Sequence, residues 1–148
     1  MFLCRLRTLL AALWLGLVAT LGAAVAPTLF AMLERTEAGR ITGQLFRIEA
    51  HVGLGLAVVL FLIERRLASQ RMAAGRGSVM SLNLLLVLGA LFCTVLGFFA
   101  LQPMMEAARQ GQGSFSFGAL HGASSTLFLV KGVLLLGLVW RAGGEHQT

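Results

Sequence analysis

The stretch that decides the fold is LLAALWLGLVATLGAAVAPTLFAML, which covers residues 9–33 and contains no charged residue. Three further apolar runs follow, over about residues 45–63, 82–101 and 117–140. Each run is close to the ~20 residues with which an α-helix crosses ~30 Å of hydrocarbon. None alternates between apolar and polar residues, as the strands of a membrane barrel do. The sequence therefore predicts an all-α fold, an integral membrane bundle of four transmembrane helices in one domain over residues 1–148.

The composition of the whole chain agrees with a membrane protein. Among its 148 residues, 57% are apolar and only 12% are charged, whereas about a quarter of a typical soluble domain is charged. These proportions exclude intrinsic disorder, which requires low hydrophobicity and high charge. The net charge of +6 comes largely from arginines at the ends of the apolar runs. That position favours contact with lipid headgroups over binding of nucleic acid.

The first run also has features of a secretory signal peptide. Arg5 and Arg7 precede it, and Ala24-Val25-Ala26 resembles a cleavage site. However, the run continues to Leu33 and exceeds the roughly 7–15 apolar residues typical of such signals. We therefore expect this segment to be retained as a membrane span.

The distribution of arginine predicts the orientation, because cytoplasmic loops carry the excess of positive residues. The two tails and the segment 64–79 hold the larger set: Arg5, Arg7, Arg65, Arg66, Arg71, Arg76 and Arg141. The opposite side holds Arg35, Arg40, Arg47 and Arg109. We therefore expect both termini in the cytoplasm. The strong preference for arginine over lysine suggests a GC-rich bacterial genome, and hence a bacterial inner membrane.

Small residues in the first run predict where helices touch. They recur at three- and four-residue steps, which lets helix backbones approach closely in lipid. The residues are Ala12, Gly16, Ala19, Ala23 and Ala26.

Polar side chains inside the predicted spans carry the functional signal, because a charge in hydrocarbon costs several kcal/mol unless it is paired or hydrated. Lys131 lies in the fourth run, about 14 Å from Trp140 along a helix. His121 and Ser124 lie on the same broad helical face. We expect this polar stripe to face the interior of the bundle. It serves either as a structural network or as a contact for a substrate, proton or cofactor.

The second run supplies partners at a matching depth. Glu49 and His51 lie about 200° apart on a helical wheel, so one face cannot present both. We expect Glu49 to pair with Lys131, and His51 to turn to another part of the core. Pairing of Glu49 with Arg35 or Arg47 at the outer interface is the alternative. The candidate intramembrane polar site thus consists of His121, Ser124, Lys131, Glu49 and His51.

A metal or haem site is a further hypothesis, since histidine is a common ligand of both. On regular helices His121 lies about 28 Å from Trp140, whereas His51 lies about 18 Å from Ile63. One iron cannot take both without a strong tilt. If the metal is copper, Met104 and Met105 are candidate soft ligands beside His121. Otherwise these methionines anchor a short interfacial segment.

Enzymatic motifs are scarce. The chain contains no HExxH, no CxxC, no glycine-rich phosphate loop, and neither aspartate nor tyrosine. A hydrolase or a nucleotide-binding enzyme is therefore not expected. A redox enzyme that uses quinone is the remaining enzymatic alternative.

Several short motifs, taken in chain order, resemble a known family. They are Trp14-Leu15-Gly16, Ala26-Pro27-Thr28-Leu29-Phe30, Gly43-Gln44-Leu45-Phe46 and His121-Gly122-Ala123-Ser124-Ser125. Their order is similar to that in the transmembrane-protein-205-like proteins, uncharacterised four-span membrane proteins grouped loosely with copper-resistance-D-like proteins. The resemblance implies a four-helix membrane fold without an assigned activity and, by analogy alone, metal or haem handling.

Two functions therefore stay open for an inner-membrane protein of this kind. One is the binding or passage of a metal, haem or small cation at the intramembrane polar site. The other is a structural or assembly role, in which the polar layer only fixes helix packing. The lipid bilayer is the expected partner, a homo-oligomer is an open alternative, and no nucleic acid is expected.

Overall fold

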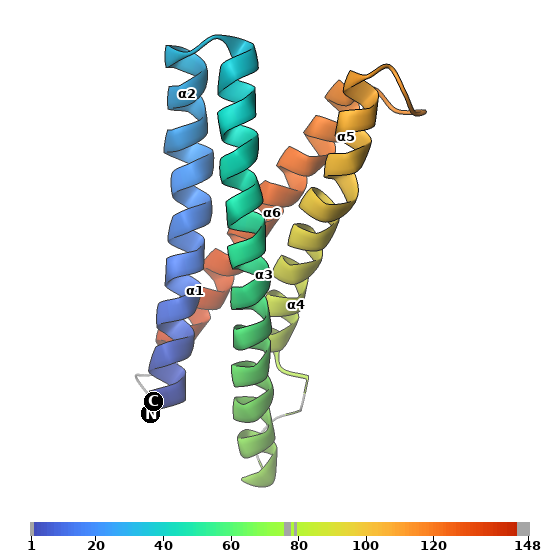
Figure 1. Cartoon of the computed structure of the whole chain (residues 1–148). Helices are drawn as coiled ribbons and strands as arrows, with labels where there is room; N and C mark the ends of the chain where they lie inside the picture. Colours follow the sequence, from blue (N-terminus) through green and yellow to red (C-terminus); the bar gives the residue numbers. More distant parts are fainter. Residues whose placement is uncertain (1, 76–77, 79, 145–148) are drawn as a thin grey trace.

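The structure is a computed structural model that describes residues 2–75, 78 and 80–144, and these residues form helices without a strand (Figure 1). In chain order the elements are α1 (Phe2–Thr20), η1 (Leu21–Val25), α2 (Ala26–Met32), α3 (Arg35–Ala73), α4 (Leu82–Thr94), η2 (Val95–Ala100), α5 (Leu101–Arg109) and α6 (Phe117–Gly144). They join into four long helices, over Phe2–Met32, Arg35–Ala73, Leu82–Arg109 and Phe117–Gly144, each long and apolar enough to cross a membrane. The predicted all-α membrane fold is confirmed, and the chain is a multi-pass membrane protein.

The outer surface of the helices suits contact with lipid. Large apolar side chains such as Val133 and Leu136 on α6 are 68% and 55% exposed. In water such a surface would be costly, whereas in a bilayer lipid tails cover it.

The helices extend well beyond the apolar runs that predicted them. Residues 34–43 lie between the first two predicted spans, yet α3 begins at Arg35, two residues after the extended residue Leu33, and runs for 39 residues. Residues 102–116 likewise lie between the third and fourth predicted spans, yet α5 continues to Arg109. Hydropathy locates the part of a helix that lies in hydrocarbon. Arginine, glutamate and glutamine favour the helix but are polar, so they can extend a helix beyond the apolar run that a hydropathy profile detects.

Two of the long helices contain a turn of π-helix just before a proline. η1 precedes Pro27 in α2, and η2 precedes Pro103 in α5. Proline has no N–H to donate to the carbonyl four residues earlier, and a wider turn accommodates the lost bond. The carbonyl of Gly97 in η2 accepts a hydrogen bond from the Ser124 hydroxyl of α6, at 2.8 Å.

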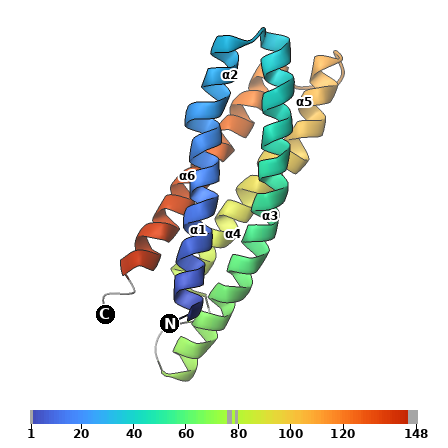
Figure 2. The same ribbon diagram turned by 60° about the vertical axis from the view of Figure 1, so that its left-hand side comes forward.

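The molecule has a closed half and an open half. The closed half contains the start of α1 and the end of α6, and there α1, α3, α4 and α6 pack around one core (Figure 1). In the open half α2 packs against α3 (Figures 1 and 2), and α5 packs against α6, but the two pairs diverge (Figure 1). The core residues of the closed half are Ala11, Trp14, Val18, Ala57, Leu60, Val87, Ala90, Leu135 and Leu138.

Buried polar contacts also join the helices of the closed half. Arg7 and Glu64 are both fully buried, and Arg7 Nη1 lies 3.4 Å from Glu64 Oε1. Arg7 Nη2 donates to the carbonyl of Ala142 at 3.4 Å. Arg141 Nε donates to Asn83 Oδ1 at 3.0 Å. These contacts connect α1 with α3 and α6, and α6 with α4.

The small residues of the first helix do not make the close helix contact that the sequence predicted. Ala12, Gly16, Ala19 and Ala23 are exposed. The buried residues of α1 are Arg7, Ala11, Trp14 and Val18. The close approach between α1 and α3 lies at Gly53, where an added Cβ would be 2.9 Å from Trp14 Nε1. The prediction was wrong because small residues occur both where helices pack tightly and where a cavity lies between them.

Candidate functional site

A cleft of about 1370 Å³ separates the two helix pairs of the open half. Its walls come from η1, α2 and the first turns of α3 on one side, and from η2, α5 and the first half of α6 on the other. Small residues keep it open: a Cβ added at Gly39 or Gly43 would meet no atom within 4 Å. The lining is mainly apolar, and its charged members are Arg35, Arg40, Glu49, Arg109 and Lys131.

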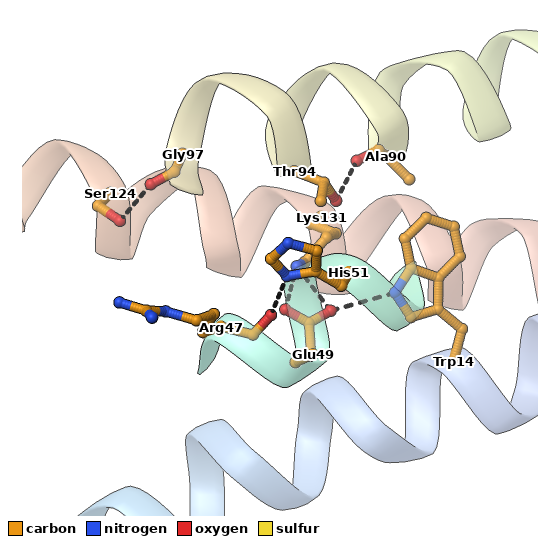
Figure 3. Close-up of polar contacts among 9 residues, drawn as sticks. All are labelled: Trp14, Arg47, Glu49, His51, Ala90, Thr94, Gly97, Ser124 and Lys131. Atoms are coloured by element: carbon orange, nitrogen blue, oxygen red, sulfur yellow. Dashed lines mark hydrogen bonds and ion pairs between the residues drawn. The ribbon is translucent and has the colours of Figure 1, made fainter. Parts of the chain in front are cut away.

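The floor of the cleft is a buried ion pair. Lys131 Nζ donates to both oxygens of Glu49, each at 2.8 Å, and Trp14 Nε1 donates to Glu49 Oε1 at 3.2 Å (Figure 3). Glu49 and Lys131 are only 2% and 3% exposed. The ammonium group also lies 4.8 Å from the centre of the Phe128 ring. The pairing that the sequence favoured is present, and it is made with Lys131 rather than with Arg35 or Arg47.

Trp14 is a member of this floor that the sequence interpretation missed. The side chain is fully buried in the core of the closed half, yet its indole N–H reaches the Glu49 carboxylate. A buried tryptophan usually finds an acceptor for its N–H. The sequence offered one indication of this contact: Trp14 lies inside the first apolar run, where a buried indole N–H needs an acceptor.

The predicted stripe on α6 faces the cleft at two levels. Ser124 lines the wall and bonds to the Gly97 carbonyl across to η2 (Figure 3). His121 lies nearer the mouth, about 15 Å from Lys131 along the helix. Its exposed ring stacks on Phe117, with the centroids 5.7 Å apart and the planes at 10°. The structure therefore brings His121, Ser124 and Lys131 to one cavity but not into mutual contact.

The expectation that His51 turns to another part of the core is wrong. His51 is exposed and does not line the cleft. Its Nδ1 lies 2.7 Å from the carbonyl oxygen of Arg47 (Figure 3). The centre of its ring lies 5.2 Å from that of the Phe99 ring. Because Glu49 faces inward, the wheel places His51 on the opposite, outward side of α3.

The donors considered for a metal are dispersed. Met105 is buried and lines the cleft, whereas Met104 is 39% exposed and lies outside the lining. Cys93 and His121 line the same cleft. Within residues 2–75, 78 and 80–144, no group of three or more His, Cys, Asp or Glu side chains comes together to hold a metal ion.

Two features of the cleft had no counterpart in the sequence interpretation. Thr42 is only 8% exposed and lines the wall, and its hydroxyl has no hydrogen-bond partner among the residues described. Phe46 and Phe128 meet edge to face, with ring centroids 4.9 Å apart, and so join α3 to α6. Thr42 and Phe46 precede Glu49 by seven and three residues. This helical spacing places them on its face and was the signal available.

Residues 9–114 match the family described as Domain of unknown function (DUF4149). The chain belongs to this family. The matched segment includes Glu49 and most of the cleft but ends before α6, which supplies Lys131. This DUF4149 membership supports the expected kinship with uncharacterised proteins, but it shows no link to transmembrane-protein-205-like or copper-resistance-D-like proteins. Neither a curated protein nor a solved structure matches the chain.

Proposed function

We propose that this protein binds an amphipathic, membrane-soluble molecule in the cleft of the open half. The observation that carries the proposal is a cavity with mainly apolar walls that ends on a buried ion pair. Its volume of about 1370 Å³ exceeds the roughly 300–1,000 Å³ of common small-molecule sites. The cleft therefore has room for an occupant of lipid size.

In a bilayer, the polar groups of the cleft determine which ligand is selected. An apolar body is already out of water in the membrane, so its entry into the cleft gains packing but little hydrophobic free energy. The polar groups on the wall and floor then decide which molecule is preferred. Thr42, Gln102 and Ser125 line the wall, and Glu49 and Lys131 form the floor.

The electrostatics of the cleft argue against a small cation or a bare metal ion as the ligand. Glu49 is the sole acidic residue of the lining, and Lys131 neutralises it. The remaining charged residues of the lining are arginines, which repel cations. Haem stays a second candidate, because the ring of His121 is exposed on the cleft wall.

The haem candidate has a direct test. Protein produced with haem available and purified in detergent would show a Soret band, and His121→Ala would abolish it. A spectrum without that band rejects haem and leaves the amphipathic ligand as the function.

The test of the proposed function fills the cleft. A photoreactive phospholipid should label cleft-lining peptides of the wild-type protein, and Gly43→Trp should abolish that labelling because its side chain occupies the cavity. Gly55→Trp is the matched control: it lies on the same helix, is exposed and is outside the lining. Equal labelling of the two variants, or no labelling of wild-type cleft peptides, would contradict the proposal and favour a purely structural role.

A further inference from the structure

We infer that the occupant of the cleft is a lipid with an anionic headgroup, held at the mouth by Arg35, Arg40 and Arg109. This inference rests on the proposed function and adds the chemical class and the placement of the ligand. It follows from three features of the lining: its charge, a buried hydroxyl without a partner, and the neutralisation of the floor.

The charged residues at the mouth of the cleft are all positive. Apart from the Glu49–Lys131 pair, every charged residue that lines the cleft is an arginine. Arg35 and Arg40 belong to α3, and Arg109 belongs to α5, so the guanidinium groups come from both walls. Guanidinium groups bind phosphate and carboxylate groups with two parallel hydrogen bonds. A headgroup between the walls can therefore be held from both sides.

Arg109 remains available to such a headgroup. Its Nη1 lies 3.4 Å from Glu106 Oε2, but the two side chains are 51% and 57% exposed. An exposed pair of this kind is weak and exchanges readily with water or another anion. The guanidinium also lies 4.8 Å over the ring of Phe117, which orients it without neutralising it.

The buried hydroxyl of Thr42 lies just below the arginines. Along α3 it is about 3 Å deeper than Arg40 and about 10 Å above Glu49. Buried polar groups are normally hydrogen-bonded, and those without a partner require an explanation. A donor at this depth suits an ester or phosphate oxygen of a lipid whose headgroup lies at the mouth.

The neutralised floor explains why the headgroup belongs at the mouth rather than beside Lys131. Both Glu49 oxygens already bond to the ammonium group, so little positive charge is left there for a second anion. Above the floor, Phe46 and Phe128 present apolar rings. Acyl chains can therefore fill the deeper part of the cleft while the anion stays between the arginines.

The experiment compares two photoreactive lipids with identical acyl chains in protein reconstituted in nanodiscs. One is a phosphatidylglycerol, which is anionic, and the other is a phosphatidylcholine, which is zwitterionic. We expect the anionic lipid to label cleft-lining peptides roughly tenfold more strongly, as charge-assisted hydrogen bonds would give. The double variant Arg40→Gln/Arg109→Gln should lose that preference. Arg47→Gln, exposed on α3 and outside the lining, should keep it.

The outcomes separate the inference from the proposed function. Equal labelling of the cleft by both lipids would overturn the inference and leave the proposed function standing. Labelling by neither lipid would overturn both. Loss of the preference in Arg47→Gln as well would show a diffuse surface effect and overturn the inference. Abolition of labelling by inorganic phosphate would identify a soluble anion as the occupant and overturn it too.

Discussion

At the scale of single residues, the Glu49 carboxylate is the most constrained group of the site. It accepts two hydrogen bonds from Lys131 and one from Trp14, and it is 2% exposed. Depth along the helices was enough to predict the partner, because few charges lie in the predicted spans. The tryptophan was not predictable in the same way, since its contact depends on how α1 rotates against α3.

Removal of the negative charge of Glu49 should destabilise the folded protein. We expect Glu49→Gln to lower the free energy of unfolding by about 3–5 kcal/mol, because Lys131 would be left as an uncompensated buried charge. Equilibrium unfolding in detergent measures this cost. The double variant Glu49→Gln/Lys131→Met should be less destabilised than Glu49→Gln alone. A single variant as stable as the wild-type protein would show that the pair contributes nothing.

At the scale of helices, the sequence located the spans but not their lengths or their contact faces. Hydropathy identified the apolar centre of each span, whereas the ends of α3 and α5 are polar and fell outside the predicted spans. The prolines were visible in the sequence, but the π-helical turns before them were not predicted from it. Glycines gave no reliable guide, because Gly53 faces Trp14 while Gly55, two residues later, faces open space.

The contrast between these two glycines gives a prediction about α1–α3 packing. In Gly53→Ala the new Cβ would lie 2.9 Å from Trp14 Nε1, and that ring is held by the core and by Glu49. We expect a loss of about 1–3 kcal/mol of unfolding free energy, as overpacking usually gives. Gly55→Ala has no neighbour within 4 Å and should be neutral or stabilising by up to about 1 kcal/mol. Equal unfolding free energies for the two variants would mean that α1 and α3 do not approach closely at this point.

At the scale of the whole molecule, the open half is the feature that the sequence did not predict. Small residues on α1 and α2 were interpreted as a contact surface, and several of them line the cleft instead. Whether a small residue packs or leaves space depends on the crossing of helices far apart in the sequence. Local patterns carry no information about that crossing.

The orientation of the whole molecule is also open to test. The start of α1 and the end of α6 lie at the same end of the structure (Figure 1), and we propose from the arginine distribution that this end is cytoplasmic. Alkaline phosphatase should be inactive when fused at either terminus and active when inserted in the turn at residues 110–113. Activity at one terminus alone would contradict four crossings. Activity at both termini would reverse the orientation and place the cleft mouth in the cytoplasm.

The contact between Arg7 and the carbonyl of Ala142 has a consequence for biogenesis. The two residues are 135 positions apart, so at ~5–20 residues per second the ribosome needs on the order of ten seconds to supply the second partner. During that interval Arg7 can already pair with Glu64 of α3, while the carbonyl of Ala142 has not yet been translated. A chain that stalls before its last helix would therefore hold α1 against α3 through Arg7 and Glu64, but it would lack the side of the core that Leu135 and Leu138 of α6 supply.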